Sequence, residues 1–160
     1  MGEYTFIVSK TCPICGERTR IIKLKSRIIA EKTDEDFCVH YKDFNPYFYH
    51  IWFCEHCGFA ADEAHFLAPM ASRHKQKIRD FLQGRQLGLD FTEERGVPEA
   101  IASYKLALYY ADLIDASLAH RAGLWLHLAW VYRAAGDEAH EREAMEKAAT
   151  PEEWQRLSSQ

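Results

Sequence analysis

The 160-residue sequence has no apolar run long enough to span a bilayer, and no charged segment followed by an apolar one at its N-terminus. It also has Phe6 where a myristoylation signal would require Ser or Thr. These absences argue against a membrane protein and against a secreted protein. We therefore expect a cytoplasmic protein that has no membrane partner.

Short catalytic motifs are missing as well. The sequence contains no phosphate-binding glycine loop, no Gly-x-Ser-x-Gly nucleophile elbow and no His-Glu-x-x-His motif. Most of its carboxylates fall on the faces of expected helices, where contact with water accounts for them. The sequence thus predicts a protein that is not an enzyme.

Cysteine is scarce, with five residues, but four of them form two Cys-x-x-Cys pairs. The chain places 38 residues between the first pair and the second. Each pair directs two sulfurs at one point, and four thiolates are the donor set of a closed, tetrahedral zinc site. A glycine follows each pair, as expected for a sharp turn that needs a positive φ. We predict a structural Zn²⁺ ion bound by Cys12, Cys15, Cys54 and Cys57.

Two other uses of these cysteines compete with zinc. Two disulfides would suit an oxidising compartment, but the chain has no secretion segment and has a long helical half that small disulfide scaffolds lack. Iron is the second competitor, because rubredoxin-type sites also use four thiolates in Cys-x-x-Cys-Gly turns. Spacing does not separate tetrahedral iron from zinc. A rubredoxin-like iron electron carrier therefore remains an alternative.

The fifth cysteine, Cys38, lies in an aromatic-rich stretch near His40, His50 and His56. This neighbourhood raises the alternatives of a second metal site or a Cys/His nucleophile. Nothing in the spacing brings a histidine against Cys38, and lone cysteines usually pack as small apolar residues. We interpret Cys38 as a packing residue, and we expect the His56 side chain to point to solvent.

The expected type of secondary structure changes from strand to helix near residue 67. Up to that point the chain is rich in β-branched and aromatic residues, and we expect short strands at 4–8, 19–25, 27–30 and 47–53. After it, apolar residues recur with the period of a helix. We expect helices at 69–83, 98–115, 118–135 and 137–149, followed by a short helix at 152–157.

The last two long helices contain a repeat-like pattern. The pattern is Trp125-x-x-Leu128-Ala129-x-x-Tyr132-x-x-x-Gly136-Asp137. It resembles the tetratricopeptide (TPR) repeat, and a weaker copy, Leu87-Gly88-x-x-Phe91, lies 41 residues earlier instead of the standard repeat of about 34. We therefore expect an irregular antiparallel bundle with TPR-like packing. The predicted fold class is α+β, with a zinc-ribbon-like metal-binding subdomain at 1–66 and a TPR-like helical subdomain at 67–160.

TPR-like helix pairs usually offer the first helix of each pair to a protein or peptide. On this alignment the exposed concave positions are Leu126, Trp130 and Arg133, and Trp and Arg are favoured anchors in interfaces. The alternative is that Trp130 packs inside one compact molecule, against the helix at 69–83 or the ribbon. We predict a non-catalytic adaptor or protein-protein interaction module, and the sequence leaves a homo-oligomer open.

Charge argues against bulk nucleic-acid binding. Residues 86–160 carry seven basic and thirteen acidic side chains, and this excess of negative charge repels phosphate backbones. A local exception lies at 18–27, where five basic residues follow the first cysteine pair. A zinc ribbon that binds nucleic acid through this basic strand is therefore the alternative function. Its residues are Arg18, Arg20, Lys23, Lys25 and Arg27.

Taken together, several segments resemble the bacterial domain-of-unknown-function family 2225. These segments are Cys12-Pro-Ile-Cys15, Asp36-Phe37-Cys38, Asn45-Pro46-x-x-Tyr49, Trp52-x-Cys54-x-x-Cys57-Gly58-Phe59-Ala60 and Ala100-x-x-x-Tyr104-Lys105-Leu106-Ala107. The similarity covers most of residues 10–150. It implies a zinc-ribbon-like part followed by TPR-like helices in a bacterial cytosolic protein, and it implies no particular activity.

Overall fold

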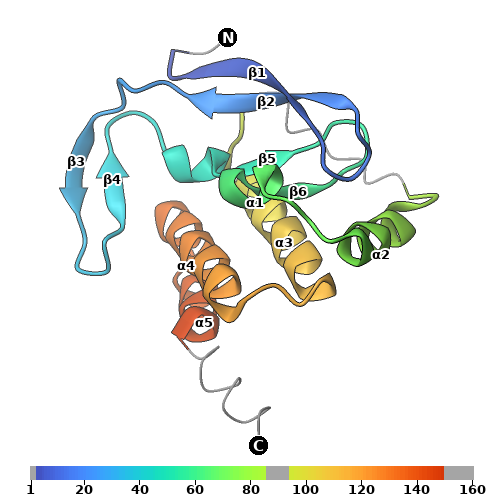
Figure 1. Cartoon of the computed structure of the whole chain (residues 1–160). Helices are drawn as coiled ribbons and strands as arrows, with labels where there is room; N and C mark the ends of the chain where they lie inside the picture. Colours follow the sequence, from blue (N-terminus) through green and yellow to red (C-terminus); the bar gives the residue numbers. More distant parts are fainter. Residues whose placement is uncertain (1–2, 86–93, 150–160) are drawn as a thin grey trace, which may run out of the picture.

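The computed structural model describes residues 3–85 and 94–149, and Figure 1 shows their arrangement. They form an α+β structure of small antiparallel strand pairs and five α-helices, which confirms the predicted class. The expected helix at 152–157 and the expected repeat copy at 87–91 lie outside the described residues. No described helix is long and apolar enough to cross a membrane.

Six short strands form three separate two-stranded antiparallel sheets within the described residues. Their bounds are β1 (Thr5–Thr11), β2 (Arg18–Leu24), β3 (Ala30–Thr33), β4 (Val39–Tyr41), β5 (Ile51–Phe53) and β6 (Ala60–Asp62). The predicted strands at 4–8 and 19–25 correspond to β1 and β2, which pair with Val8 opposite Ile21. The strand predicted at 27–30 starts later, at Ala30.

The predicted strand at 47–53 is wrong in its first half. Pro46–Tyr49 forms a 3₁₀ turn, η1, and only β5 is a strand. The Asn45 side chain accepts a hydrogen bond from the Tyr47 backbone N–H, and Pro46 supplies a φ suited to a helical first turn. The Asn-Pro pair therefore starts a helical turn in a segment whose aromatic residues favour a strand.

The five α-helices of the described residues follow the last strand in the sequence. Their bounds are α1 (Glu63–Leu67), α2 (Ser72–Leu82), α3 (Val97–Leu113), α4 (Leu118–Ala135) and α5 (Glu138–Ala149). The helix predicted from residue 69 begins later, because Pro69 lies in an extended link between α1 and α2. Ala68 has a ψ of 149°, which is the conformation that residues before proline prefer.

Gly136 ends α4 where the sequence predicts an end. Its φ of 75° is left-handed, a conformation that glycine adopts without steric cost. The Gly136 N–H donates to the carbonyl of Arg133, and the Asp137 N–H donates to the carbonyl of Tyr132. These bonds close the last turn of α4, and α5 then packs against it.

One continuous core joins the two halves of the chain. α3 packs across β5, β6 and η1, and α4 packs on α3 (Figure 1). The core includes Ile21 and Trp52 from the strands and Tyr104 and Leu128 from the helices. The predicted boundary after residue 66 falls inside α1, beside the buried Phe66, and the division into two subdomains stays a prediction.

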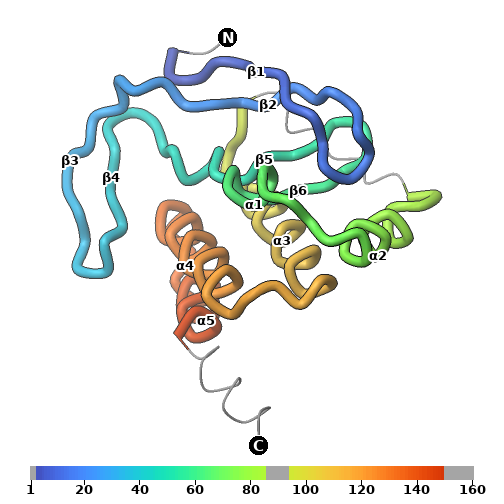
Figure 2. The backbone as a smooth tube through the Cα atoms, viewed as in Figure 1, coloured from blue at the N-terminus to red at the C-terminus, as the bar shows by residue number. Residues whose placement is uncertain are grey.

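The β3–β4 hairpin stands apart from the other two sheets and lies beside α4 (Figure 2). Two carboxylates near its turn, Asp34 and Asp36, form ion pairs with Arg133 of α4. The hairpin therefore packs on a helix that follows it by almost a hundred residues. This contact brings a segment from the N-terminal third of the chain to its C-terminal half.

Candidate metal centre

Each cysteine pair lies in a tight turn at the end of a hairpin. In the first turn, between β1 and β2, the Gly16 N–H donates to the Cys12 carbonyl at 3.0 Å, and the Cys12 N–H donates to the Glu17 carbonyl at 2.9 Å. Gly16 has a φ of 76°, so the residue after Cys15 must tolerate a left-handed conformation. The glycine in the motif is thus explained by the turn.

The second turn, between β5 and β6, repeats this geometry. The Gly58 N–H donates to the Cys54 carbonyl at 2.9 Å, and the Cys54 N–H donates to the Phe59 carbonyl at 2.8 Å. Gly58 has a φ of 91°. The two hairpins therefore present their cysteines through equivalent backbone turns.

The four predicted ligands come together. Their sulfur atoms all lie within 4.8 Å of one another, and the Cys12–Cys57 and Cys15–Cys54 sulfurs are each 3.7 Å apart. A tetrahedron with Zn–S bonds of about 2.3 Å separates its sulfurs by about 3.8 Å. Disulfide sulfurs are about 2.0 Å apart, and all five cysteines are free thiols. The cluster suits a metal ion, and zinc and iron both accept this donor set.

The clustered thiols affect one another's protonation. Hydrogen bonding with Cys54, together with burial, raises the pKa of Cys12 to about 12. Hydrogen bonds from Cys12 and Cys57 hold the pKa of Cys54 well below its usual range. The neighbouring thiols thus stabilise one thiolate, and the negative charge of that thiolate makes it unfavourable to deprotonate a second thiol beside it. A divalent cation balances these negative charges, so the cluster is electrostatically suited to a metal.

Helices hold both cysteine turns in place. The Arg79 guanidinium, from α2, donates to the Ile14 carbonyl in the first turn at 2.8 Å. The Tyr110 hydroxyl, from α3, donates to the Gly58 carbonyl in the second turn at 2.8 Å. Sequence reasoning missed both residues, because nothing local marks a helix side chain that binds a backbone atom about 50 residues away or more.

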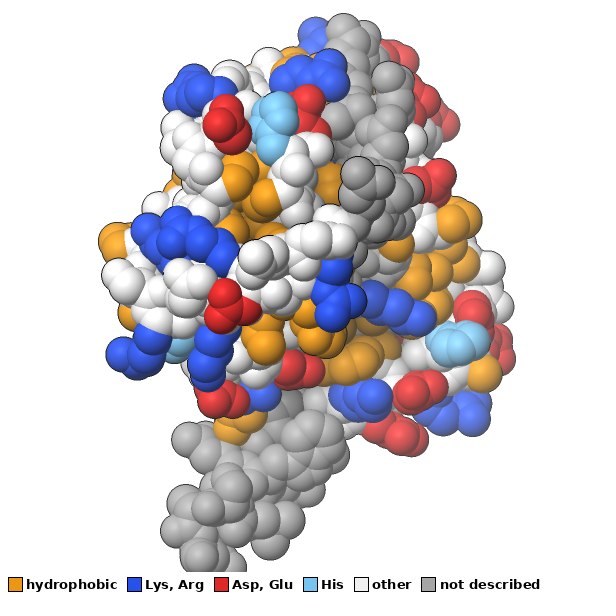
Figure 3. Space-filling view, turned by 90° about the vertical axis from the view of Figure 1, so that its right-hand side faces the viewer, with side chains coloured by type: hydrophobic (Ala, Val, Ile, Leu, Met, Phe, Trp, Pro, Cys, Tyr) orange, Lys and Arg blue, Asp and Glu red, His pale blue; other side chains and the backbone are white. Residues whose placement is uncertain are grey.

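The basic strand of the nucleic-acid alternative is largely engaged within the molecule. The Arg20 guanidinium pairs with Glu55 at 3.2 Å, the Lys23 ammonium lies 3.6 Å from Glu63, and Arg18 donates to Ser9. The face on the side of α2 also mixes basic, acidic and apolar side chains (Figure 3). No continuous basic surface is seen on that face.

The expectations for Cys38 and His56 are met in part. Cys38 is buried, as expected for a packing residue, and burial raises the pKa of its thiol to about 11. Contrary to the expectation, a histidine lies near it, because one ligand atom each of Asp34, Cys38 and His40 lies within 4.8 Å of the other two. A protonated thiol is a poor nucleophile. His56 is exposed, yet its Nε2 lies 2.9 Å from the Arg18 carbonyl, so the ring contacts β2 rather than projecting freely.

The predicted concave surface on α4 does not have the expected exposure. Leu126 is half-buried, and Trp130 is only 6% exposed. Of the two alternatives for Trp130, the structure has the one in which the side chain packs inside the molecule against the N-terminal part. The Trp130 indole N–H donates to Asp36 at 3.0 Å, and its ring packs on Tyr47. The Arg133 guanidinium is half-buried between carboxylates. The chain's own hairpin contacts Trp130 and Arg133, two of the three positions that the repeat pattern assigns to a partner.

Comparison with known proteins identifies a family but no characterised relative. A family model described as "Uncharacterized protein conserved in bacteria (DUF2225)" matches residues 7–152. Searches of curated proteins and of solved structures gave no match. The matched region contains all four cysteines of the centre and every described helix, and it confirms the resemblance found in the sequence. The chain is a member of this bacterial family, DUF2225.

Proposed function

We propose that this chain is a non-catalytic zinc-binding protein whose cysteine centre is structural. The observation that carries the proposal is the spacing of the four sulfur atoms, which suits one tetrahedral Zn²⁺ ion. Four protein ligands fill the coordination sphere, so no position is left for a substrate or a hydrolytic water. The centre links two hairpins that also contact α2 and α3, and its role is to stabilise that junction.

Metal content tests this part of the proposal. Protein purified without added metal should contain about one zinc per chain and no iron. The Cys54→Ser variant should lose the metal, whereas Cys38→Ser, which alters a buried thiol outside the centre, should keep it. One iron per chain with visible absorbance would establish the electron-carrier alternative. Full zinc content in Cys54→Ser would contradict the ligand set.

We also infer that the protein works by binding a partner protein or peptide, with the TPR-like helices as its scaffold. α3, α4 and α5 pack consecutively, as TPR-like helices do. The face of α4 that such repeats offer to a ligand contacts the β3–β4 hairpin through Trp130 and Arg133. We therefore assign the partner-binding role to the outer side of that hairpin.

Two exposed apolar side chains support this assignment. Phe37, in the turn of the hairpin, is 78% exposed, and Ile29, just before β3, is 62% exposed. Exposed aromatic side chains are frequent anchors of interfaces. Across residues 3–85 and 94–149, β3 and β4 pair as strands only with each other, so their edges suit an extended peptide.

The backbone at Phe37 supports the assignment independently. Phe37 has a φ of 72°, a left-handed conformation that a bulky residue adopts at a cost of about 1–2 kcal/mol. The fold gains little contact from a ring that is mostly in water. A residue that is costly to the fold and exposed at a turn is typical of a functional position.

Partner capture with the full chain as bait tests the role. Wild type should retain specific proteins from a bacterial lysate, and Phe37→Gly should lose them while remaining folded. Leu67→Ala is the matched control, because Leu67 is also exposed but lies on α1. The proposed surface is wrong if Phe37→Gly captures the same proteins as wild type, or if Leu67→Ala loses them equally. If wild type captures nothing, the partner-binding role is wrong.

A further inference from the structure

Two further groups of metal-ligating side chains lie outside the cysteine centre among the described residues. In the group of Asp34, Cys38 and His40, the carboxylate is already paired with Arg133, so the other group is the better candidate for a metal ion. Asp62 ends β6, His65 is in α1, and His120 is in the first turn of α4. One ligand atom from each of these residues lies within 4.8 Å of the other two. Three elements from both halves of the chain therefore meet at this point.

Both histidines direct the same ring nitrogen at one carboxylate. The His65 Nδ1 lies 2.9 Å from each Asp62 carboxylate oxygen, and the His120 Nδ1 lies 3.7 Å from Asp62 Oδ1. Zinc bonds of about 2.0–2.1 Å in a tetrahedron place neighbouring N and O ligands about 3.3 Å apart. The two distances lie on either side of that value, so the spacing of the ligand atoms is close to that of a zinc site.

The two imidazole rings also lie face to face. Their centroids are 3.5 Å apart and their planes differ by 28°. The His120 side chain is 11% exposed and that of His65 is 49% exposed, so one ligand is held in the fold and the other closes the site from the surface. Because an ion lies in the plane of each ring that binds it, the exposed His65 ring must rotate out of the stack to share an ion with His120, and the site is accessible to an ion from solution.

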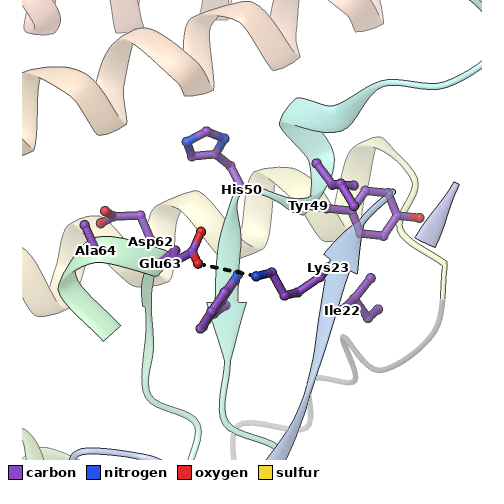
Figure 4. A pocket seen from close by; sticks show the side chains of 9 residues that line it. Ile22, Lys23, Tyr49, His50, Asp62, Glu63 and Ala64 are labelled. Atoms are coloured by element: carbon purple, nitrogen blue, oxygen red, sulfur yellow. Dashed lines mark ion pairs between the residues drawn. The ribbon is translucent and has the colours of Figure 1, made fainter. Parts of the chain in front are cut away.

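Cavities adjoin the cluster on two sides. A cavity of about 310 Å³ is lined by both histidines and by apolar side chains that include Phe59, Met70 and Ile114. A second cavity, of about 530 Å³, is lined by Asp62, Glu63 and Lys23, and Figure 4 shows these polar groups around it. An ion at the cluster would thus have free space beside it for a further ligand.

We propose that Asp62, His65 and His120 form a second metal site, which binds a divalent transition-metal ion of the zinc class and leaves one coordination position open. Two imidazoles and one carboxylate are borderline ligands that suit Zn²⁺ and its neighbours better than Ca²⁺ or Mg²⁺. Three protein ligands with an open position differ from the closed cysteine centre. Water or a small anionic ligand from the adjoining cavity fills the open position.

Calorimetric titration of Zn²⁺ into protein whose cysteine centre is already loaded tests this site. Wild type should bind one further equivalent. His65→Ala should weaken that binding by at least about tenfold, while the zinc content of the cysteine centre stays unchanged. Because His65 is a surface residue, its variant should fold, and circular dichroism checks this.

The chain offers a matched control in α5. His140 forms the same i, i+3 pair with Asp137, with Nδ1 2.6 Å from the carboxylate, and no second histidine joins that pair among the described residues. His140→Ala should therefore leave the additional equivalent unchanged. In wild type, Zn²⁺ should also shift the ring resonances of His65 and His120 in NMR spectra.

Three outcomes would overturn the proposal. They are the absence of a second equivalent in wild type, an unchanged affinity in folded His65→Ala, and an equal loss in His140→Ala. The first equivalent, measured by elemental analysis, reports on the cysteine centre separately. Failure of the second site therefore leaves the structural zinc proposal intact, and the reverse also holds.

Discussion

Arg133 of α4 and Asp36 of the β3–β4 hairpin form a forked ion pair across 97 residues of sequence. The two terminal guanidinium nitrogens donate to the two carboxylate oxygens at 3.0 and 2.8 Å. The same guanidinium also donates to Asp34 and, through Nε, to Glu141 of α5. Hydrogen bonding to Arg133 lowers the pKa of Asp36 to about 2. One side chain therefore joins the hairpin, α4 and α5.

Removing this side chain should loosen the hairpin. We expect Arg133→Ala to lower the free energy of unfolding by about 2–3 kcal/mol, because three half-buried carboxylates lose their shared cationic partner. Arg133→Lys should restore little, since an ammonium group cannot form the forked pair. Urea unfolding followed by tryptophan fluorescence measures both. Arg142→Ala, at an exposed position in α5, is the control and should change stability by less than about 0.5 kcal/mol.

The Arg133 contacts illustrate what the sequence can predict and what it cannot. The periodicity of α4 and the Gly136 end were both recognisable, because they depend on residues within a few positions of one another. The same pattern identified the face that carries Trp130 and Arg133. What covers that face depends on a hairpin almost a hundred residues earlier, and no local pattern encodes that contact. The sequence therefore left open whether this face is exposed or packed, and the structure has Trp130 packed.

The two metal-ligand clusters differ in the same way. Two Cys-x-x-Cys pairs predict a shared centre, because each pair supplies half of the ligands of a four-cysteine site. In the second cluster, only the Asp62–His65 spacing is local, and His120 joins it through the packing of α4 on the rest of the fold. Contacts from a helix side chain to a distant turn, such as that of Tyr110 with Gly58, also could not be predicted from a local sequence pattern.

Tyr110 provides a test of how far the helices support the cysteine centre. Tyr110→Phe removes the hydroxyl that donates to Gly58 and leaves that carbonyl without this donor. We expect a loss of stability of about 1 kcal/mol and faster transfer of zinc to a chelator, followed with a colorimetric zinc indicator. Tyr109→Phe, which alters the neighbouring exposed ring, should affect neither. Equal zinc-transfer rates in Tyr110→Phe and wild type would show that the hydrogen bond does not support the centre.

His127 should make stability depend on pH. Burial, together with the nearby His50 ring at 4.5 Å, lowers the pKa of His127 to about 4, while Asp62 acts in the opposite direction. Between about pH 6.5 and 4 the unfolded chain binds a proton that the folded chain does not, so stability falls as pH falls through this window. Above pH 7 the His127 ring is neutral in both the folded and the unfolded chain, so it no longer makes stability depend on pH.

The His127→Gln variant isolates this contribution. The stability of wild type relative to the variant should fall by about 1 kcal/mol between pH 7.5 and pH 5.5. Urea unfolding of both proteins with saturating zinc measures the difference, and the pH dependence of the metal centre cancels because it is common to both. A constant difference across this range would contradict a neutral, half-buried His127.

The left-handed backbone at Phe37 predicts an unusual stabilising substitution. Phe37→Gly should raise the free energy of unfolding by about 0.5 kcal/mol, because relief of the left-handed strain exceeds the entropy cost of glycine. Phe37→Ala removes the same ring but keeps a Cβ, so it should give no such gain. Thermal unfolding of both variants compares them directly. Destabilisation by Phe37→Gly would mean that the ring contributes to the fold.

The wide separation of the two cysteine pairs determines the order in which the chain assembles during synthesis. Both pairs leave the ribosome well before α4, so the two cysteine turns can share a metal ion while the residues between them still form an open loop. The β3–β4 hairpin lies inside that loop, and its partner Arg133 is made almost a hundred residues later. If the centre binds its metal as proposed, binding can precede docking of the hairpin, and a nascent chain without the metal presents α4 with a loop whose ends are not yet joined.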